Sequence, residues 1–169
     1  MGDIPDVERM KEAGLAIWGE IELAAVFEKG RVLAVTGTNG KTTTTSLLGE
    51  IMRHAGLDVK VVGNIGIPYT SLVTKTTEAS VTVAEISSFQ LETVHRFCPD
   101  VSAILNITPD HLNRHHTMEN YRKAKERITA NQGEHQVCIP AAKVTRTSLI
   151  FSRETPAILA IAPAAITFS

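Results

Sequence analysis

The residues that most clearly suit a chemical role are two glycines, a lysine and a threonine in the stretch Gly37-Thr38-Asn39-Gly40-Lys41-Thr42. Glycines let a backbone approach a phosphate closely, and the free N–H groups at the start of a helix attract an anion. Lys41 can reach the outer phosphates of a nucleotide, and the hydroxyl of Thr42 can ligate Mg²⁺. The common phosphate-loop pattern has one more glycine, at the position that Val35 holds here. The alternative interpretation is an ordinary turn with an exposed lysine.

The elements on either side of this loop decide between the two interpretations. The apolar run Val32–Val35 predicts a short buried strand, and apolar residues at helical spacing continue from Lys41 as far as Met52. Strand, glycine-rich loop and helix is the context that a phosphate-binding loop requires. The sequence therefore favours a phosphate-binding loop (P-loop) over a turn.

Polar residues follow the next two predicted strands, 57–62 and 81–84, at the edge where parallel sheets bind ligands. Glu85 is a candidate Mg²⁺ ligand, with a surface charge as the alternative. Asn64 lies between glycines and is either a substrate contact or a turn residue. Ser87 and Gln90 either contact a substrate or cap the helix that follows.

A fourth predicted strand, 101–107, is followed by an aspartate and three histidines. A lone histidine is more often structural, but imidazole and carboxylate together suit divalent metals. The residues concerned are Asp110, His111, His115 and His116. The helix predicted over 118–130 carries several basic residues, including Lys125, and composition alone favours a solvated basic face.

Composition excludes several classes of protein. The net charge of the 169 residues is −1, which gives no electrostatic case for a nucleic-acid partner or a membrane surface. Cys98 and Cys138 lack metal or redox spacing, which indicates reduced thiols in a cytosolic protein. The C-terminal apolar run is interrupted by Pro156 and Pro163 and is too short for membrane insertion.

The alternation of strands and helices over 31–139 predicts an α/β domain with a mainly parallel sheet. Before it, a helix over 6–13, a strand over 15–18 and a helix over 20–27 cannot form a core of their own. We interpret residues 1–30 as the tail of a preceding domain and a connector. A short strand is expected within 134–139, and residues 140–169 receive no assignment.

Together these stretches resemble the Mur ligases of peptidoglycan synthesis. The loop Thr36–Thr43 is similar to that family's ATP loop, including its shorter glycine spacing, and folylpolyglutamate synthetases have a similar loop. Three other stretches resemble the branch of the family that adds D-glutamate: Gly63–Gly66, Glu85–Glu92, and Asp110–Arg114 followed by Tyr121–Lys125. The resemblance covers roughly residues 3–133.

The resemblance implies the domain organisation. The fold would be a P-loop-containing central Mur ligase domain, incomplete here, with a partial ATP-binding domain over 31–139. Residues 1–30 would end the N-terminal uridine-binding domain, and 140–169 would be an aberrant C-terminus. Most of the first domain and the C-terminal domain are missing, which a truncated or frame-shifted gene product would explain.

The resemblance also implies cofactors and roles. ATP phosphates would lie against residues of the loop and the first helical turn: Gly37, Thr38, Asn39, Gly40, Lys41, Thr42, Thr43 and Thr44. One Mg²⁺ would be held by Thr42 and Glu85, and a second by His111 and a carbamylated Lys125. Lys41, Lys125 and His111 would be the catalytic residues. Asn64, Ser87 and Gln90 would contact the substrate.

The implied activity is that of an ATP-dependent ligase. The carboxylate of UDP-N-acetylmuramoyl-L-alanine would become an acyl phosphate, and the amine of D-glutamate would then displace phosphate. The protein would act in the cytoplasm as a monomer, and the chain alone would show little or no turnover. Two alternatives stay open: a related Mur ligase or folylpolyglutamate synthetase, and an inactive nucleotide-binding fragment.

Overall fold

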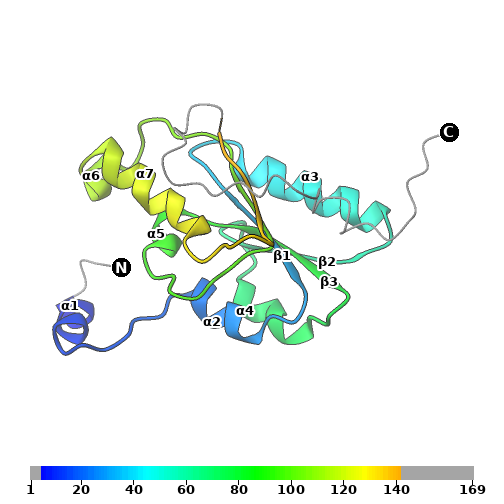
Figure 1. Cartoon of the computed structure of the whole chain (residues 1–169), viewed down its shortest axis with the longest axis horizontal. Coiled ribbons are helices and arrows are strands. Elements are labelled where there is room, and N and C mark those ends of the chain that lie inside the picture. Colours follow the sequence, from blue (N-terminus) through cyan, green and yellow to red (C-terminus); the bar gives the residue numbers. More distant parts are fainter. Residues whose placement is uncertain (1–4, 142–169) are drawn as a thin grey trace.

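Five parallel strands form one sheet in the order β2-β3-β1-β4-β5 in the computed structural model, which describes residues 5–141 (Figure 1). Their bounds are Arg31–Thr36 for β1, Asp58–Gly63 for β2, Ser80–Glu85 for β3, Val101–Ile104 for β4 and Val137–Ile139 for β5. Every pairing within this described sheet is parallel, so the predicted α/β class with a parallel sheet is confirmed. The expectations for residues 142–169 lie outside the described part of the chain.

Helices connect the strands and cover both faces of the sheet. The α-helices are α1 Pro5–Glu12, α2 Glu20–Phe27, α3 Lys41–His54, α4 Tyr69–Leu72, α5 Ser88–Leu91, α6 Leu112–His115 and α7 Met118–Glu126, and the 3-10 turns are η1 Val73–Lys75 and η2 Arg127–Thr129. α3 packs on one face through Leu48 and Met52, next to Leu33 and Val83. Leu47, on its other side, is 58% exposed.

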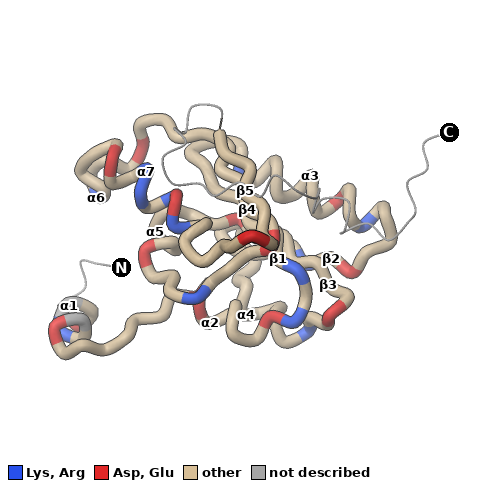
Figure 2. Tube along the Cα trace, viewed as in Figure 1, with Lys and Arg blue, Asp and Glu red and all other residues tan. Residues whose placement is uncertain are grey.

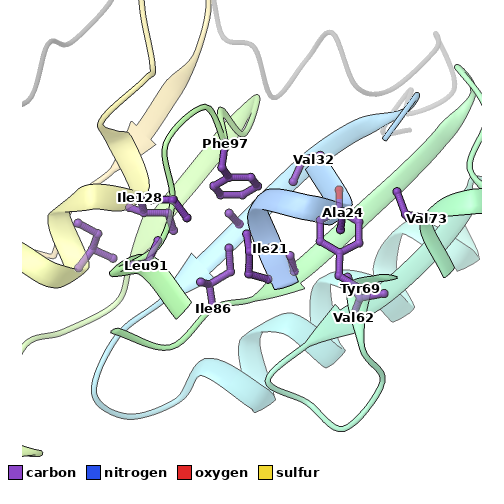
Figure 3. Close-up of a cluster of buried hydrophobic side chains, with 14 residues drawn as sticks. Ile21, Ala24, Val32, Val62, Tyr69, Val73, Ile86, Leu91, Phe97 and Ile128 are labelled. Carbon is purple, nitrogen blue, oxygen red and sulfur yellow. The ribbon is translucent and has the colours of Figure 1, made fainter. Parts of the chain in front are cut away.

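The larger core lies on the other face of the sheet. Side chains of α2, α4, α5 and η2 meet those of the central strands there (Figure 3). Ile21, Tyr69, Leu91 and Ile128 are fully buried in this cluster. Because successive side chains of a strand point to opposite faces, Val32 faces this core while its neighbour in sequence faces α3.

Helix α2 belongs to this core by packing. Its Glu22 is 1% exposed and accepts backbone N–H bonds from His95, Arg96 and Phe97 at 2.8–3.1 Å. A buried carboxylate with three such donors ties α2 to the segment that precedes β4. The division of the chain at residue 30 concerns domain origin and stays a prediction.

Three sequence-based boundaries differ from the structure. The strand expected over 15–18 is wrong: these residues form no strand, Leu15 is 59% exposed, and none of the five described strands pairs with this segment. β4 ends at Ile104 and not at residue 107, because β1 itself ends at Thr36 and the residues after Ile104 bond to the loop that follows it. The helix expected over 118–130 ends at Glu126 and continues as η2.

Charges of both signs are interspersed along the described chain (Figure 2). Both cysteines are free thiols, as expected from their spacing. Among residues 5–141, no helix is long and apolar enough to cross a membrane.

Candidate functional site

The phosphate-loop candidate lies where β1 ends and α3 begins. Gly40 adopts the left-handed conformation, with φ 82°, and Lys41 starts the helix. Gly37 has φ 157°, and a Cβ there would lie 3.1 Å from the Cβ of Leu105. Glycine is therefore favoured at both positions, at Gly40 by the left-handed turn and at Gly37 by the close approach to the segment after β4. The first turn of α3 leaves backbone N–H groups without helical partners, which is what an anion site needs.

The ammonium group of Lys41 folds back over the loop. Its Nζ donates to the carbonyl oxygens of Gly37 and Thr38, each at 2.9 Å. The side chain therefore lies along the loop, at the end of the helix where phosphate would bind. The remaining predicted loop residues, Thr43 and Thr44, are in the first turn of α3, where the N–H of Thr44 donates to Gly40.

Two strand ends and the start of α3 bring three polar side chains together. The hydroxyl of Thr42 donates to Oε2 of Glu85 at 2.8 Å, and Nδ2 of Asn64 donates to Oε1 at 3.0 Å. Glu85 is 2% exposed, so its alternative interpretation as a surface charge is wrong. A hydroxyl and a carboxylate in contact are hard oxygen donors of the kind that Mg²⁺ prefers, so this pair fits the predicted first metal.

Lys125, in α7, also contacts this phosphate loop. Its residue is 2% exposed, and Nζ donates to the carbonyl oxygen of Gly37 at 2.8 Å. The interpretation as part of a solvated basic face is therefore wrong for this lysine. Burial, together with the charge of Lys41, lowers the pKa of Lys125 to about 8, against a smaller opposing effect of Asp110. A buried lysine with a lowered pKa reaches the neutral form near physiological pH, and only that form reacts with CO₂.

His111 begins α6 in a left-handed conformation, with φ 52°. Its ring lies 5.0 Å from that of Phe89, and Nε2 lies 3.5 Å from Oδ2 of Asp110. His115 turns inward instead, where Nε2 lies 3.0 Å from the hydroxyl of Ser88 and burial lowers the pKa of the ring.

Within residues 5–141, no group of three or more His, Cys, Asp or Glu side chains is arranged to hold a metal ion. The metal-binding segment expected from Asp110 and three histidines is therefore not formed by those residues alone. The assignment of His111 and a carbamylated Lys125 to a second Mg²⁺ stays a prediction, since it requires a group that lysine acquires by modification.

Ser87 and Gln90 form a capping box at the start of α5. The Ser87 hydroxyl accepts from the N–H of Gln90, and the Gln90 side chain accepts from the N–H of Ser87 at 3.0 Å. Nε2 of Gln90 also donates to Glu20 in α2 at 3.3 Å. The capping role is thus present, and the contact of these residues with a substrate stays a prediction.

Two residues at the site were missed by sequence reasoning. Tyr121 in α7 places its hydroxyl 3.2 Å from that of Thr38, and its ring lies 4.8 Å from Nζ of Lys125. Asn106, just past β4, bonds to Asn39 through both ends of its amide. Asn106 follows a strand only in the structure, because the sequence placed it inside the strand predicted over 101–107, so the strand-end rule that selected Asn64 and Glu85 did not select it.

Comparisons with known proteins agree on one family. A model of the Mur ligase middle domain matches residues 35–157. This range extends past residue 133, where the resemblance in the motifs ends. The UDP-N-acetylmuramoylalanine--D-glutamate ligase of Lachnospira eligens is 62% identical over 137 residues, which are 81% of this chain and 30% of that protein. The protein of the same name from Koribacter versatilis is 49% identical over 162 residues, 90% of this chain and 36% of that protein.

Solved structures agree on the fold. A crystal structure of MurF ligase from Thermotoga maritima in complex with ADP has a TM-score of 0.59 at 22% identity, and the match covers 74% of this chain and 32% of that one. A MurF structure from Acinetobacter baumannii has a TM-score of 0.52 at 24% identity, covering 71% and 28%. The chain spans about a third of the length of the relatives it matches. The family model and the sheet with its P-loop lead to one conclusion: the chain belongs to the Mur ligase family and contains its middle domain.

Proposed function

We propose that this chain carries the nucleotide-binding part of an ATP-dependent ligase that joins D-glutamate to UDP-N-acetylmuramoyl-L-alanine. The observation that carries the proposal is the convergence of Lys41 and Lys125 on the carbonyl oxygen of Gly37, beside the contact of Thr42 with Glu85. A relative that bears the name of this ligase is 62% identical over 137 matched residues. The matched part of the chain spans about 30% of that relative's length. We therefore propose the complete reaction only for a protein as long as the whole relative.

The loop and the first turn of α3 would hold the phosphates of ATP. Residues 37–44 provide the glycines, the N–H groups of a helix start and the Lys41 ammonium group. In the reaction a carboxylate attacks an anionic phosphate, so charge repulsion opposes the approach. Lys41 offsets that repulsion with a positive charge at the outer phosphates.

Two Mg²⁺ ions, when bound, would supply further positive charge beside the phosphates. Thr42 and Glu85 fit the first ion by chemistry and contact. The second would require Lys125 as a carbamate beside His111. The lowered pKa of Lys125, about 8, favours that modification, because the neutral amine forms the N–C bond to CO₂ and then releases a proton.

The remaining assignments concern the acceptor and its setting. Asn64, Ser87 and Gln90 lie beyond the ends of β2 and β3, where they would contact UDP-N-acetylmuramoyl-L-alanine. The acyl phosphate formed on its carboxylate would be displaced by the amine of D-glutamate. We further propose that the protein works in the cytoplasm as a monomer.

Thermal unfolding with Mg²⁺ and a non-hydrolysable ATP analogue tests the proposal. A ligand at a hundred times its dissociation constant adds about 2.7 kcal/mol to the free energy of unfolding. We expect an upward shift for the wild type and for Lys123→Ala, whose side chain is 65% exposed, and a much smaller shift for Lys41→Ala. A cooperative transition that nucleotide does not move in the wild type would contradict nucleotide binding by this chain.

A second candidate, a fragment that binds nucleotide without turnover, is favoured for the isolated chain by its share of the relatives' length. Catalysis needs both substrates held in reacting geometry, which lids and domains usually provide. Substrate-dependent ADP release separates the two candidates. Release by the 169-residue chain alone would overturn the fragment interpretation.

A further inference from the structure

The first half of the phosphate-binding loop is fastened to the segment that follows β4. The N–H of Thr38 donates to the carbonyl oxygen of Asn106 at 3.0 Å, and the N–H of Leu105 donates to Thr36 at 2.9 Å. The hydroxyl of Thr38 accepts from the N–H of Thr108 at 3.0 Å. The loop therefore continues the β1–β4 ladder beyond the last residue of β4.

The side chain of Asn106 adds a second, specific connection. Oδ1 accepts from the N–H of Asn39 and Nδ2 donates to the carbonyl oxygen of Asn39, each at 2.9 Å. A carboxamide has one donor and one acceptor side by side, so it can satisfy both polar groups of one residue at once. Aspartate would lose the donor. The absence of a side chain at Gly37 favours this close packing, since a Cβ there would lie 3.1 Å from the Cβ of Leu105, the residue before Asn106.

This arrangement divides the backbone donors of the loop into two sets. The N–H groups of Thr38 and Asn39 are both committed to Asn106. The N–H groups of residues 41–43, at the start of α3, have no carbonyl one turn earlier in the helix to accept them. An anion would therefore meet the second set, and its geometry depends on how firmly the first set is held.

We infer that Asn106 is a positioning residue, which clamps residues 38 and 39 so that the N–H groups of residues 41–43 are preorganised for phosphate. The inference rests on the proposed nucleotide-binding function and goes beyond it by naming a residue that touches no phosphate. Asn106 is only partly buried, so water can replace its bonds in the free protein. Its loss is therefore expected to affect phosphate binding more than folding.

The test compares Asn106→Ala with a matched variant, Asn131→Ala. Nδ2 of Asn131 donates to the carbonyl oxygens of His95 and Phe97, each at 3.0 Å, so it also clamps backbone with two bonds. These bonds lie in the segment before β4, at the opposite edge of the sheet from the phosphate loop. Binding of inorganic tripolyphosphate and of ADP, each with Mg²⁺, is measured by calorimetry, and amide exchange at Asn39 is followed in parallel.

We expect Asn106→Ala to weaken binding of both probes ten-fold or more and to speed amide exchange at Asn39. Asn131→Ala should bind both probes within two-fold of the wild type. Binding by Asn106→Ala within two-fold of the wild type would overturn the inference and leave the proposed function standing, as would equal weakening in both variants. Failure of the wild type to bind either probe would overturn the proposed function and the inference with it.

Discussion

Replacement of Lys125 by methionine should make the protein more stable while removing a group the reaction is proposed to need. Lys125 is 2% exposed, and its pKa falls from 10.5 to about 8. Methionine is similar in length, carries no charge and packs well against an aromatic ring such as that of Tyr121. The carbonyl oxygen of Gly37, which Lys125 contacts, keeps its bond from Lys41.

The magnitude follows from the two pKa values. A difference of about 2.5 between unfolded and folded states corresponds to about 3 kcal/mol of destabilisation by the charged lysine at pH 7. The lost hydrogen bond offsets about 1 kcal/mol of the gain. We therefore expect Lys125→Met to raise the free energy of unfolding by about 2 kcal/mol at pH 7.

The sign of the pH dependence is fixed by the direction of the pKa shift. Between pH 8 and 10.5 the folded wild type binds fewer protons than the unfolded chain, so its stability rises with pH relative to the variant. The advantage of Lys125→Met should shrink by about 2 kcal/mol between about pH 7 and about pH 9.5.

Urea unfolding in CO₂-free buffer at the two pH values measures this advantage. Lys123→Met, on the same helix but with a 65% exposed side chain, is the control for helix propensity and should change stability by at most about 0.5 kcal/mol at either pH. Destabilisation by Lys125→Met at pH 7, or an advantage that does not change with pH, would refute the reasoning.

Three further predictions concern backbone packing, a buried carboxylate and the metal pair. Gly63→Ala should lower the free energy of unfolding by more than about 3 kcal/mol, since its Cβ would lie 2.2 Å from the carbonyl oxygen of Glu85. Gly66 has a similar φ but open space around it, so Gly66→Ala should cost only about 1 kcal/mol in the same urea assay. Glu22→Gln should cost about 2–3 kcal/mol because an amide cannot accept all three N–H groups, and Glu119→Gln, on the surface, should be near neutral by thermal unfolding. Thr42→Val should weaken Mg²⁺-dependent ADP binding about ten-fold or more in calorimetry while preserving the transition temperature; unchanged Mg²⁺ dependence would argue against Thr42 as a ligand.

Much of the site could be predicted because the ends of the strands can be located from the sequence. Thr42, Asn64 and Glu85 each follow an apolar run, and the carboxyl ends of parallel strands meet at one edge. Period and turn residues thus predicted the parallel sheet, and the family resemblance implied that Thr42 and Glu85 share a metal ion. The bond from Asn64 to Glu85 was not predicted, since Asn64 was assigned to the substrate. They did not indicate the strand over 15–18 correctly, since a four-residue apolar run says nothing about whether a partner strand is available.

The burial of Lys125 was missed although a signal existed. Tyr121, Ala124, Lys125 and Ile128 follow the i, i+3, i+4, i+7 spacing of a buried helix face, and all four are at most 8% exposed. Composition suggested a solvated basic face because it ignores that spacing. The pairing of Asn106 with Asn39 could not be predicted, since which side chain meets which peptide group depends on the three-dimensional turn after β4.

The central claim is that the loop from Gly37 to Thr42 binds a nucleotide with Mg²⁺ through Lys41. Calorimetric titration of the 169-residue chain with a non-hydrolysable ATP analogue and Mg²⁺, beside Lys41→Ala, tests it most directly. We expect saturable binding that weakens at least ten-fold in the variant and that requires Mg²⁺. Equal affinity in the wild type and Lys41→Ala would show that the nucleotide binds elsewhere or without Lys41.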